Sequence, residues 1–269
     1  MTGLAARFLD LHRGSTPLLM PNPWDRGSAV LLESLGFDAL ATTSSGFAAT
    51  LGRLDGGVTR DEAIEHARTV AEAVSVPVSA DLENCFADDP EGVAETARLA
   101  AEAGLAGCSL EDYSGPESDT IYDAGPAAER VRAAAEAAHA APDGFVLTAR
   151  AENHVHGRDD LADTIARLQS YQDAGADVLF APGLRELSDI RELIGAVDLP
   201  VNVLVLPGMP SVSELADAGV SRISVGGAFA FAALGAATEA ARELREDGTY
   251  GYWKTAAEGA KAAREAFSG

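Results

Sequence analysis

The feature that most constrains the fold of this chain is an alternation, repeated eight times, of a short apolar segment with an amphipathic, alanine-rich one. The apolar segments are rich in β-branched residues and almost continuously apolar, as expected of strands buried on both faces of a parallel sheet. They lie at 18–24, 39–44, 76–83, 107–112, 145–152, 177–183, 200–206 and 222–227. Eight strands that alternate with helices can close on themselves, so the sequence predicts an α/β fold, a (β/α)8 barrel of the TIM type.

The segments between the predicted strands have helical periodicity, and several end in a glycine. The helical patterns include 90–103, 126–140, 158–174 and 211–218. Helices commonly end on a left-handed residue, and the glycines at such positions are Gly36, Gly104, Gly175 and Gly219. A doubly wound open sheet is the alternative fold. It would be favoured by a glycine-rich dinucleotide fingerprint after the first strand, and NPWDRGSA is not one.

The length of the chain fits one domain, 1–269, because a barrel of this type needs about 250 residues and no linker interrupts the pattern. Beyond residue 228 the sequence predicts two extra C-terminal helices, the last at about 252–267. The segment of about 228–269 exceeds what a barrel needs. We expect it to pack on a neighbouring subunit.

The charge and composition of the chain exclude several classes of partner and location. The chain has 42 acidic and 20 basic residues, which gives a formal net charge of −22. Such a field repels nucleic acid and anionic membranes, so neither is an expected partner. The sequence has no apolar run long enough to span a membrane and no signal-peptide pattern. Because Cys85 and Cys108 cannot form a disulfide framework, we predict a cytoplasmic protein.

Polar residues gather where the predicted strands end. In (β/α)8 barrels, the catalytic residues lie at the carboxyl ends of the strands. The residues at these positions include Asn22, Trp24, Asp25, Thr43, Ser44, Ser45, Gly46, Asp81, Glu83, Asn84, Glu111, Asp112, Arg150, Glu152, Asn153 and Asn202. The sequence therefore predicts one site at this end of the barrel, in which Trp24, Thr43 and Asn202 contact the substrate.

Three carboxylates in this set predict a metal site. Asp81 and Glu83 are two residues apart, so on a strand both side chains face the barrel mouth, and Glu111 adds a third carboxylate from the adjacent strand. Carboxylates held together are costly unless a cation lies between them. Oxygen ligands without cysteine or histidine favour Mg²⁺ or Mn²⁺. The alternative for each residue is a helix cap or a salt bridge.

Arg150 is the cationic counterpart of these carboxylates. Its guanidinium is suited to holding a substrate carboxylate or phosphonate through two parallel hydrogen bonds. A structural salt bridge to one of the carboxylates is the alternative interpretation. We expect 44–46, Ser-Ser-Gly, to form a turn that offers hydroxyl and N–H groups to an anion.

The remaining reactive residues carry weaker signals. His154 and His156 form an H-x-H pair of the kind that binds zinc in metal-dependent hydrolases. Because no other predicted strand end carries a histidine, a solvated loop is the better interpretation of the pair. Cys85 has no neighbouring histidine in the sequence, and Cys108 is interpreted as a buried strand residue.

Several strand-end motifs together resemble one family. TTSSGFAA, LGRLDGG, SADLEN, SLED, TARAEN and PVNVLVLPGMPSVSELADAGVSRISVGG are similar to successive strand ends of the isocitrate lyase/phosphoenolpyruvate mutase superfamily. The resemblance runs over about 18–250. It implies a barrel that makes or breaks a C–C or C–P bond next to a 2-oxo carboxylate. The family habit of exchanging a helix between subunits implies a homodimer or homotetramer in which about 228–269 is exchanged.

The resemblance also implies roles for individual residues. Asp81 matches the aspartate that holds Mg²⁺, and the acidic residues matching those that bind the metal directly or through water are Glu83, Asp55 and Glu111. The segment that takes up the substrate carboxylate matches Ser45, Gly46 and Phe47. Arg150 matches the arginine at the other end of the substrate. The metal chelates the oxo acid and stabilises its enolate.

The loop after Glu111 departs from the family patterns. Lyases of the family carry a loop with a catalytic cysteine here, whereas 113–122 contains no cysteine, lysine or histidine. In the phosphonate enzymes, the loop has asparagine or threonine where this chain has Asp119 and lysine where it has Glu117. An aspartate would repel a phosphonyl group at neutral pH, so a phosphonate substrate is disfavoured.

These departures favour a Mg²⁺-dependent lyase or decarboxylase that acts on a small 2-oxo or 2-hydroxy dicarboxylate through a metal-stabilised enolate. Glu111 and Arg150 are predicted catalytic residues, and the candidate proton donors are Tyr113, Asp119 and Tyr122. We expect loop 113–125 to close over the site and exclude water. The alternatives are a phosphonopyruvate mutase or hydrolase and a non-catalytic barrel that binds an oxo acid.

Overall fold

The computed structural model describes residues 3–268, and it contains eight parallel strands in a nearly closed barrel. The strands are β1 (Leu18–Met20), β2 (Leu40–Ala41), β3 (Val78–Asp81), β4 (Gly107–Glu111), β5 (Val146–Arg150), β6 (Val178–Phe180), β7 (Val201–Leu204) and β8 (Arg222–Ser224). Paired strands run from β2 through β3 to β8 and on to β1. At the remaining seam, the Ala41 N–H donates to the Pro21 carbonyl at 3.2 Å. The predicted TIM-type barrel and all eight predicted strands are confirmed.

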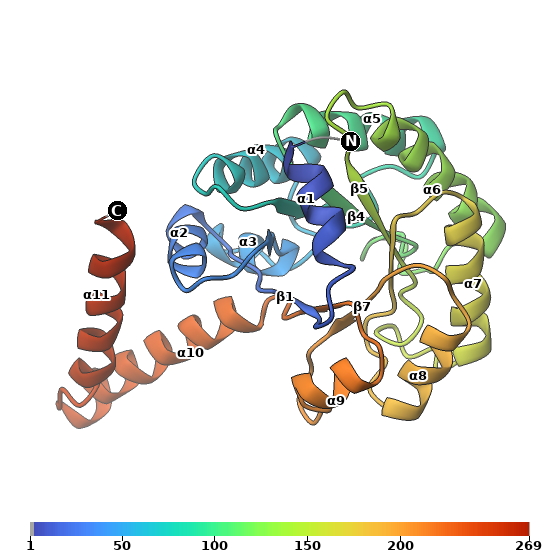
Figure 1. Cartoon of the computed structure of the whole chain (residues 1–269). Helices are drawn as coiled ribbons and strands as arrows, with labels where there is room; N and C mark the ends of the chain where they lie inside the picture. Colours follow the sequence, from blue (N-terminus) through green and yellow to red (C-terminus); the bar gives the residue numbers. More distant parts are fainter. Residues whose placement is uncertain (1–2, 269) are drawn as a thin grey trace.

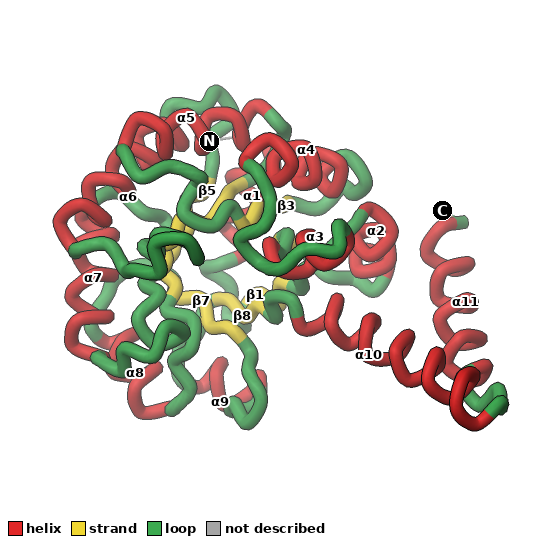
Figure 2. The backbone as a smooth tube through the Cα atoms, turned by 180° about the vertical axis from the view of Figure 1, so that it is seen from behind, coloured by secondary structure: helices red, strands yellow, loops and turns green. Residues whose placement is uncertain are grey.

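Helices surround the strands, which form the central ring in Figure 2. They are α1 (Gly3–Leu11), α2 (Arg26–Ser34), α3 (Ser44–Thr50), α4 (Arg60–Ala71), α5 (Pro90–Glu102), α6 (Ala124–His139), α7 (Leu161–Asp173), α8 (Leu187–Gly195), α9 (Val212–Asp217), α10 (Ala228–Arg242), the π-helical turn η1 (Glu243–Asp247) and α11 (Trp253–Phe267). Local sequence sets where they begin. At α4, for example, Thr59 and Glu62 form a capping box that satisfies the free N–H groups of the first turn.

The apolar core has two parts that together fix the barrel. Most of it lies between the strands and the surrounding helices, where alanines of α5 and α6 allow the two helices to pack closely. The other part fills the barrel interior near the amino ends of the strands, where Phe8 of α1 packs with Leu18, Val146 and Val178. The barrel interior is therefore filled at the amino end of the strands, and it opens at the carboxyl end.

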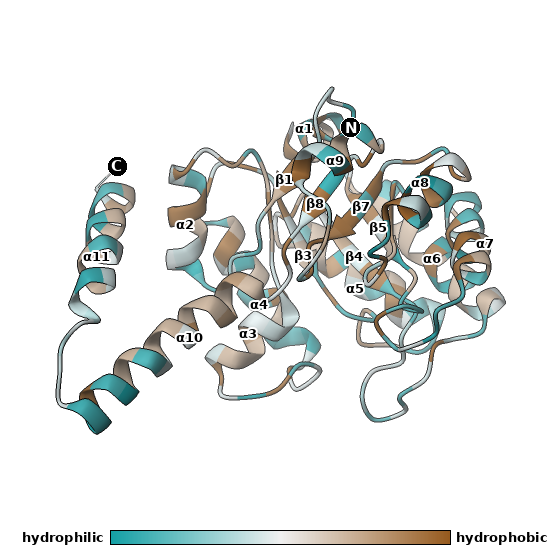
Figure 3. Ribbon diagram, turned by 90° about the horizontal axis from the view of Figure 1, so that it is seen from below, coloured by the Kyte–Doolittle hydropathy of each residue, from teal (hydrophilic) through white to brown (hydrophobic). Residues whose placement is uncertain are grey.

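The chain from 228 to 268, here called the C-terminal arm, leaves the barrel (Figure 1). Of the residues in α10 only Ala230 is buried, while Phe229, Phe231 and Leu234 are exposed. Figure 3 shows α10 extending away from the barrel before α11 turns back towards α2. An apolar helix with one buried residue presents a surface that a second copy can cover.

We expect Leu234→Glu to shift the protein from a homodimer or homotetramer towards monomer, because the charge would be buried where α10 meets another copy. Light scattering after size-exclusion chromatography measures the mass. Val212→Glu places the same charge at a similarly exposed apolar position on α9 and serves as the control. A wild-type protein that is monomeric at micromolar concentration would contradict the expectation. The predicted exchange of about 228–269 stays a prediction.

None of the helices within residues 3–268 combines the length and the apolar character needed to cross a membrane. The cytoplasmic location stays a prediction.

Candidate functional site

Two adjoining cavities open at the carboxyl ends of the strands. The inner cavity, of about 190 Å³, lies within the barrel, and its polar lining consists of Asn22, Thr42, Thr43, Ser44, Ser45, Asp55, Ser79, Asp81, Ser109, Arg150, Asn202, Arg222 and Ser224. The outer cavity, of about 380 Å³, lies under the loops, and its polar and aromatic lining consists of Ser44, Asp55, Glu83, Glu111, Tyr113, Arg150, Glu152 and His156. Because Ser44, Asp55 and Arg150 line both, the two cavities form one site with a shared boundary.

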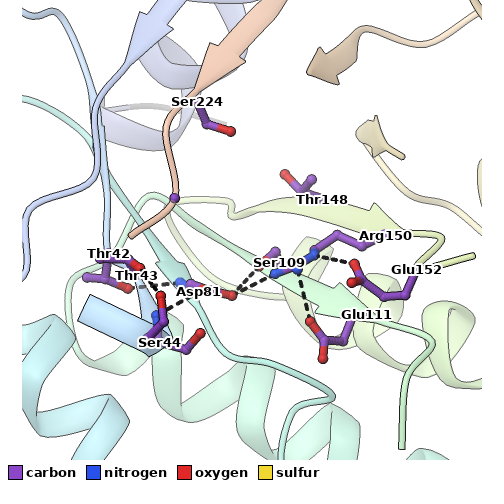
Figure 4. A network of polar contacts seen from close by, with 12 residues as sticks. Thr42, Thr43, Ser44, Asp81, Ser109, Glu111, Thr148, Arg150, Glu152 and Ser224 are labelled. Atoms are coloured by element: carbon purple, nitrogen blue, oxygen red, sulfur yellow. Dashed lines mark hydrogen bonds and ion pairs between the residues drawn. The ribbon is translucent and has the colours of Figure 1, made fainter. Parts of the chain in front are cut away.

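Arg150 lies at this boundary and pairs with three carboxylates (Figure 4). Its Nη1 donates to Asp81 Oδ1 at 2.8 Å, its Nη2 is 3.1 Å from Glu111 Oε2, and its Nε donates to Glu152 Oε1 at 2.8 Å. The barrel register brings these groups together, since Glu111 of β4 lies beside Arg150 of β5. The alternative interpretation, in which Arg150 forms a structural salt bridge, is therefore confirmed, and Arg150 has three carboxylate partners instead of one.

Asp81 is fixed from a second direction by the segment after β2. Its Oδ2 accepts from the Ser44 N–H at 3.0 Å, and its backbone N–H donates to the Thr42 hydroxyl at 2.9 Å. Ser109 donates to Asp81 Oδ1 at 3.3 Å. A carboxylate held by this many donors keeps one orientation, so it offers a rigid edge of the site.

Negative charge exceeds positive charge around the boundary. Five carboxylates line the two cavities, those of Asp55, Asp81, Glu83, Glu111 and Glu152, and Arg150 is the one cation among residues 3–268 that pairs with any of them. Burial, with the charges of Asp81 and Asp55, raises the pKa of Glu83 to about 8. Burial, against the opposing charge of Arg150, also raises the pKa of Glu111. This imbalance favours a bound cation.

The carboxylates do not form a finished metal site as they stand. Within residues 3–268, no three histidine, cysteine or acidic side chains are arranged to hold an ion. The predicted convergence of Asp81, Glu83 and Glu111 is interrupted because Arg150 lies between Asp81 and Glu111. The predicted placement of Glu83 by strand alternation is wrong, since β3 ends at Asp81 and Glu83 adopts a left-handed φ of 50°.

The residues nevertheless fit a hard divalent ion. Glu83 Oε1 is buried and has no hydrogen-bond partner, which is costly for a carboxylate oxygen. Burial and the charge of Asp81 raise the pKa of Asp55, although Ser44, Arg150 and Gly56 partly oppose this shift. The four candidate ligands all offer carboxylate oxygens, which Mg²⁺ and Mn²⁺ prefer. The assignment of Asp81, Glu83, Asp55 and Glu111 as ligands stays a prediction that these observations support.

The loop after β4 covers the outer cavity. Tyr113, Gly115 and Pro116 line it, and the Pro116 ring lies so close to Gly56 that a Cβ there would come within 2.7 Å. Tyr113 donates its hydroxyl to Asp119 Oδ1 at 2.9 Å, and Asp119 itself does not line the cavity. The predicted closure of loop 113–125 over the site stays a prediction, and the contact between Pro116 and Gly56 supports it.

The structure separates the remaining proton-transfer candidates. His156 is exposed in a turn, as the solvated-loop interpretation predicts, and it also lines the outer cavity and stacks on Tyr113 with ring centroids 3.7 Å apart. His154 instead faces Thr164 and Asp159, and the two histidines form no zinc pair. The prediction of Tyr122 as a proton donor is wrong, because its hydroxyl donates to Asp88 and its ring lies against Arg130, outside both cavities.

The predicted substrate-binding residues divide into two groups. Thr43, Ser45 and Asn202 line the inner cavity. Trp24, Gly46 and Phe47 line neither cavity: an added Cβ on Gly46 would lie 3.2 Å from Trp24 Cβ, and Phe47 stacks on His66. The predicted turn at 44–46 is the first turn of α3, where the Thr43 hydroxyl accepts from the Gly46 N–H at 3.3 Å. The substrate contacts of Trp24, Gly46 and Phe47 stay predictions, and packing accounts for all three.

Two residues of the site had no assigned role in the sequence. Glu152 forms the third ion pair of Arg150, and its spacing of two residues from Arg150 on an extended segment was the available signal. Arg222, the first residue of β8, lines the inner cavity. Its position gave no signal, because Arg222 lies at the amino end of its strand, away from the carboxyl ends that carry the catalytic residues of such barrels.

Comparison with known proteins shows which family the chain resembles over most of its length. The family described as phosphoenolpyruvate phosphomutase matches residues 8–245. The 2-methylisocitrate lyase of Escherichia coli K12 is 30% identical over 87% of this chain and 81% of its own length. Oxaloacetate decarboxylase 2 of Pseudomonas fluorescens Pf0-1 is 29% identical over 91% of this chain and 84% of its own length.

Solved structures agree with the sequence comparisons. A protein from Burkholderia cenocepacia J2315 superimposes with a TM-score of 0.90 at 50% identity, covering 93% of this chain and 91% of that one. The structure of 2,3-dimethylmalate lyase superimposes with a TM-score of 0.84 at 27% identity, covering 93% of this chain and 90% of that one.

Proposed function

The chain belongs to the isocitrate lyase/phosphoenolpyruvate mutase superfamily as a carbon–carbon lyase, and we propose that its substrate is a small 2-oxo or 2-hydroxy dicarboxylate. One observation carries this proposal: five carboxylates surround a single paired guanidinium at the mouth of a cavity of only about 190 Å³. An excess of oxygen donors suits a divalent cation, and the small cavity suits a small acid, since drug-sized ligands occupy about 300–1,000 Å³.

Asp55, Asp81, Glu83 and Glu111 would hold Mg²⁺ or Mn²⁺. When bound, the ion supplies Lewis-acid polarisation of an oxo or hydroxyl group next to a carboxylate. Arg150 keeps Asp81 and Glu111 oriented through its ion pairs and presents positive charge to the substrate. These roles need a rigid boundary between the cavities, which the hydrogen bonds of Asp81 provide.

The bond-breaking step leaves an electron pair on one fragment, and a carbon of that fragment must then be protonated. When the C–C bond of a 2-oxo acid breaks, CO₂ leaves and the other fragment retains the electron pair as an enolate. When the C–C bond of a 2-hydroxy acid breaks, a carboxylate of the site takes the hydroxyl proton as the carbonyl fragment forms, and the other fragment retains the electron pair as an enolate. We assign the proton for its carbon to the Tyr113 hydroxyl, which lines the outer cavity. Burial and the hydrogen bond to Asp119 raise the pKa of Tyr113 to about 12, so the hydroxyl keeps its proton at neutral pH.

We expect Tyr113→Phe to lower kcat by about 10²-fold with little change in KM, the lower end of the range for a general acid. Asp119→Ala removes the partner that orients the hydroxyl, so its effect should be smaller. Steady-state kinetics measure both. Tyr122→Phe is the matched control, because that ring lies outside both cavities. Wild-type kcat in Tyr113→Phe would assign the proton to another group, with His156 the nearest neighbour.

Metal removal tests the proposed function. Purified protein incubated with oxaloacetate or a substituted malate should release pyruvate or another 2-oxo acid. We expect a strong chelator to abolish this release and added Mg²⁺ or Mn²⁺ to restore it. Turnover that a chelator leaves unchanged would reject the metal-dependent mechanism. Tight binding of acid and metal without turnover would instead identify a non-catalytic oxo-acid-binding barrel.

A phosphonopyruvate mutase or hydrolase is the second candidate, favoured by the family match over residues 8–245. Glu117 and Asp119, whose charges were expected to repel a phosphonyl group, are exposed and line neither cavity, so the structure leaves this candidate open. A ³¹P signal that leaves the phosphonate region on incubation with phosphonopyruvate would favour this candidate over the first.

A further inference from the structure

Arg222 is a buried cation inside the barrel that the proposed chemistry does not use. Its side chain rises from the first residue of β8 and is 2% exposed. Its Nε donates to Asn202 Oδ1 at 2.9 Å and its Nη2 to the Thr148 hydroxyl at 3.2 Å. Its Nη1 lies 3.1 Å from His12 Nε2. These three partners are neutral acceptors, so two of its five N–H groups have no partner among residues 3–268.

No acidic side chain within residues 3–268 forms a salt bridge with Arg222. Buried arginines are normally paired, because an unpaired buried charge is expensive. Burial and the charge of Arg150 lower the pKa of Arg222 to about 9. Burial likewise lowers the pKa of His12 to about 3, so the imidazole is neutral and cannot repel or balance the guanidinium. The positive charge is therefore uncompensated.

Arg222 lines the inner cavity together with small hydrogen-bonding groups. Ser79, Ser109 and Ser224 are buried hydroxyls on its wall, and Asn202 links Ser224 to Arg222 by donating to the Ser224 hydroxyl at 3.0 Å. Arg150, the other cation of this cavity, is already paired with carboxylates. The inner cavity thus has a positive charge without an acidic partner at Arg222, and an excess of carboxylates at its mouth, around Arg150. A dianion whose far end points into the barrel would satisfy Arg222.

We propose that Arg222 binds the second carboxylate of the substrate, the one that does not face the acidic mouth. This inference rests on the proposed function, since it assigns the orientation of the acid in the same site. A guanidinium binds a carboxylate through charge-assisted hydrogen bonds, and the serines around it can donate further ones. The 190 Å³ of the inner cavity limits the acid to a short one.

The assignment also favours one reaction over another. A carboxylate that is paired with Arg222 is stabilised in the bound substrate, and this stabilisation is lost if the group leaves as neutral CO₂. Interactions that are stronger in the ground state than in the transition state oppose catalysis. Arg222 therefore disfavours loss of that carboxylate, and it favours cleavage in which the fragment keeps it.

Binding by calorimetry in Mg²⁺ buffer tests the proposal with two acids that differ at one end. Malate carries the second carboxylate, and 2-hydroxybutyrate carries a methyl group in its place. We expect wild-type protein to prefer malate. Arg222→Met should weaken malate binding by about 30-fold or more, the lower end for removing one partner of a buried charge pair, and change 2-hydroxybutyrate binding less than about twofold.

A second pair of variants keeps the test decisive if Arg222→Met does not fold. Ser224→Asp would place a carboxylate within the Asn202 network beside Arg222 and so occupy the proposed site. We expect Ser224→Asp to raise Tm while abolishing the preference for malate. Ser224→Ala, the matched control, should keep that preference.

Three results would overturn the assignment: a wild-type protein without preference for malate, equal weakening of both acids by Arg222→Met, or undiminished malate binding by Ser224→Asp. These results are distinct from failure of the proposed function. Malate binding that depends on Arg222 without turnover would reject the lyase and retain the carboxylate site. If the wild type turns over substrate and Arg222→Met keeps the wild-type preference for malate, the lyase function would be retained and the carboxylate site at Arg222 would be rejected.

Discussion

Arg150→Gln is expected to lower kcat/KM by about 10²–10³-fold and to destabilise the protein by about 3–5 kcal/mol at neutral pH. The reason is the same for both effects. Arg150 contributes the only cation paired with Asp81, Glu111 and Glu152 among the described residues, and these carboxylates are largely buried. Without it, they must repel one another or take up protons. Either outcome disturbs the boundary between the two cavities.

Urea denaturation and steady-state kinetics measure the two effects. Divalent metal should raise the Tm of Arg150→Gln more than that of the wild type, because the variant retains all five carboxylates and lacks the competing guanidinium. The kcat/KM and the free energy of unfolding of Arg150→Lys should lie between those of the wild type and Arg150→Gln. An ammonium group cannot pair with three carboxylates in the fixed geometry of a guanidinium.

Arg98 offers a matched control for the stability effect. It also lies between two carboxylates, Glu95 and Glu102, but on the exposed face of α5. Arg98→Gln should change the free energy of unfolding by less than about 1 kcal/mol, as for exposed ion pairs. Equal effects of Arg98→Gln and Arg150→Gln would show that the buried carboxylates do not depend on Arg150.

The barrel was predictable from the sequence because its strands are short, apolar and regularly spaced. The end at which the site lies followed from the fold alone, and Asp81, Glu111 and Arg150 were found there. What the sequence could not show was how these side chains pair. Arg150 meets Glu111 through the lateral register of β4 and β5, and it meets Asp81 of β3 over the intervening strand β4. Neither relation is encoded in spacing along the chain.

Other predictions failed where a strand ended earlier than expected. Alternation holds only within a strand, and Glu83 lies beyond the end of β3 in a left-handed conformation. Ser44 begins a helix rather than a turn because the Thr43 side chain caps it. Phe47 then points away from the inner cavity to His66. Local capping thus decided side-chain direction after β2, and a left-handed backbone conformation decided it after β3.

Asp112 is the residue whose loss should destabilise the protein most after Arg150. It is 2% exposed, and its Oδ2 accepts from Arg167 Nη1 at 3.0 Å and from the Tyr171 hydroxyl at 2.6 Å. Its Oδ1 accepts from the backbone N–H of Glu152 at 2.8 Å. Asp112→Ala leaves these buried donors without their acceptor. We expect a loss of about 3–5 kcal/mol in the free energy of unfolding, measured by urea denaturation.

The same change should reach the site through Glu152, whose backbone Asp112 holds beside β5. If Glu152 shifts, Arg150 loses its third ion pair, so kcat should fall even in protein that remains folded. Tyr171→Phe separates the two effects, because it removes one donor to Asp112 and leaves the Glu152 N–H in place. It should cost about 1–2 kcal/mol with kcat unchanged. A fall in kcat for Tyr171→Phe as large as that for Asp112→Ala would show that activity follows stability and not the position of Glu152.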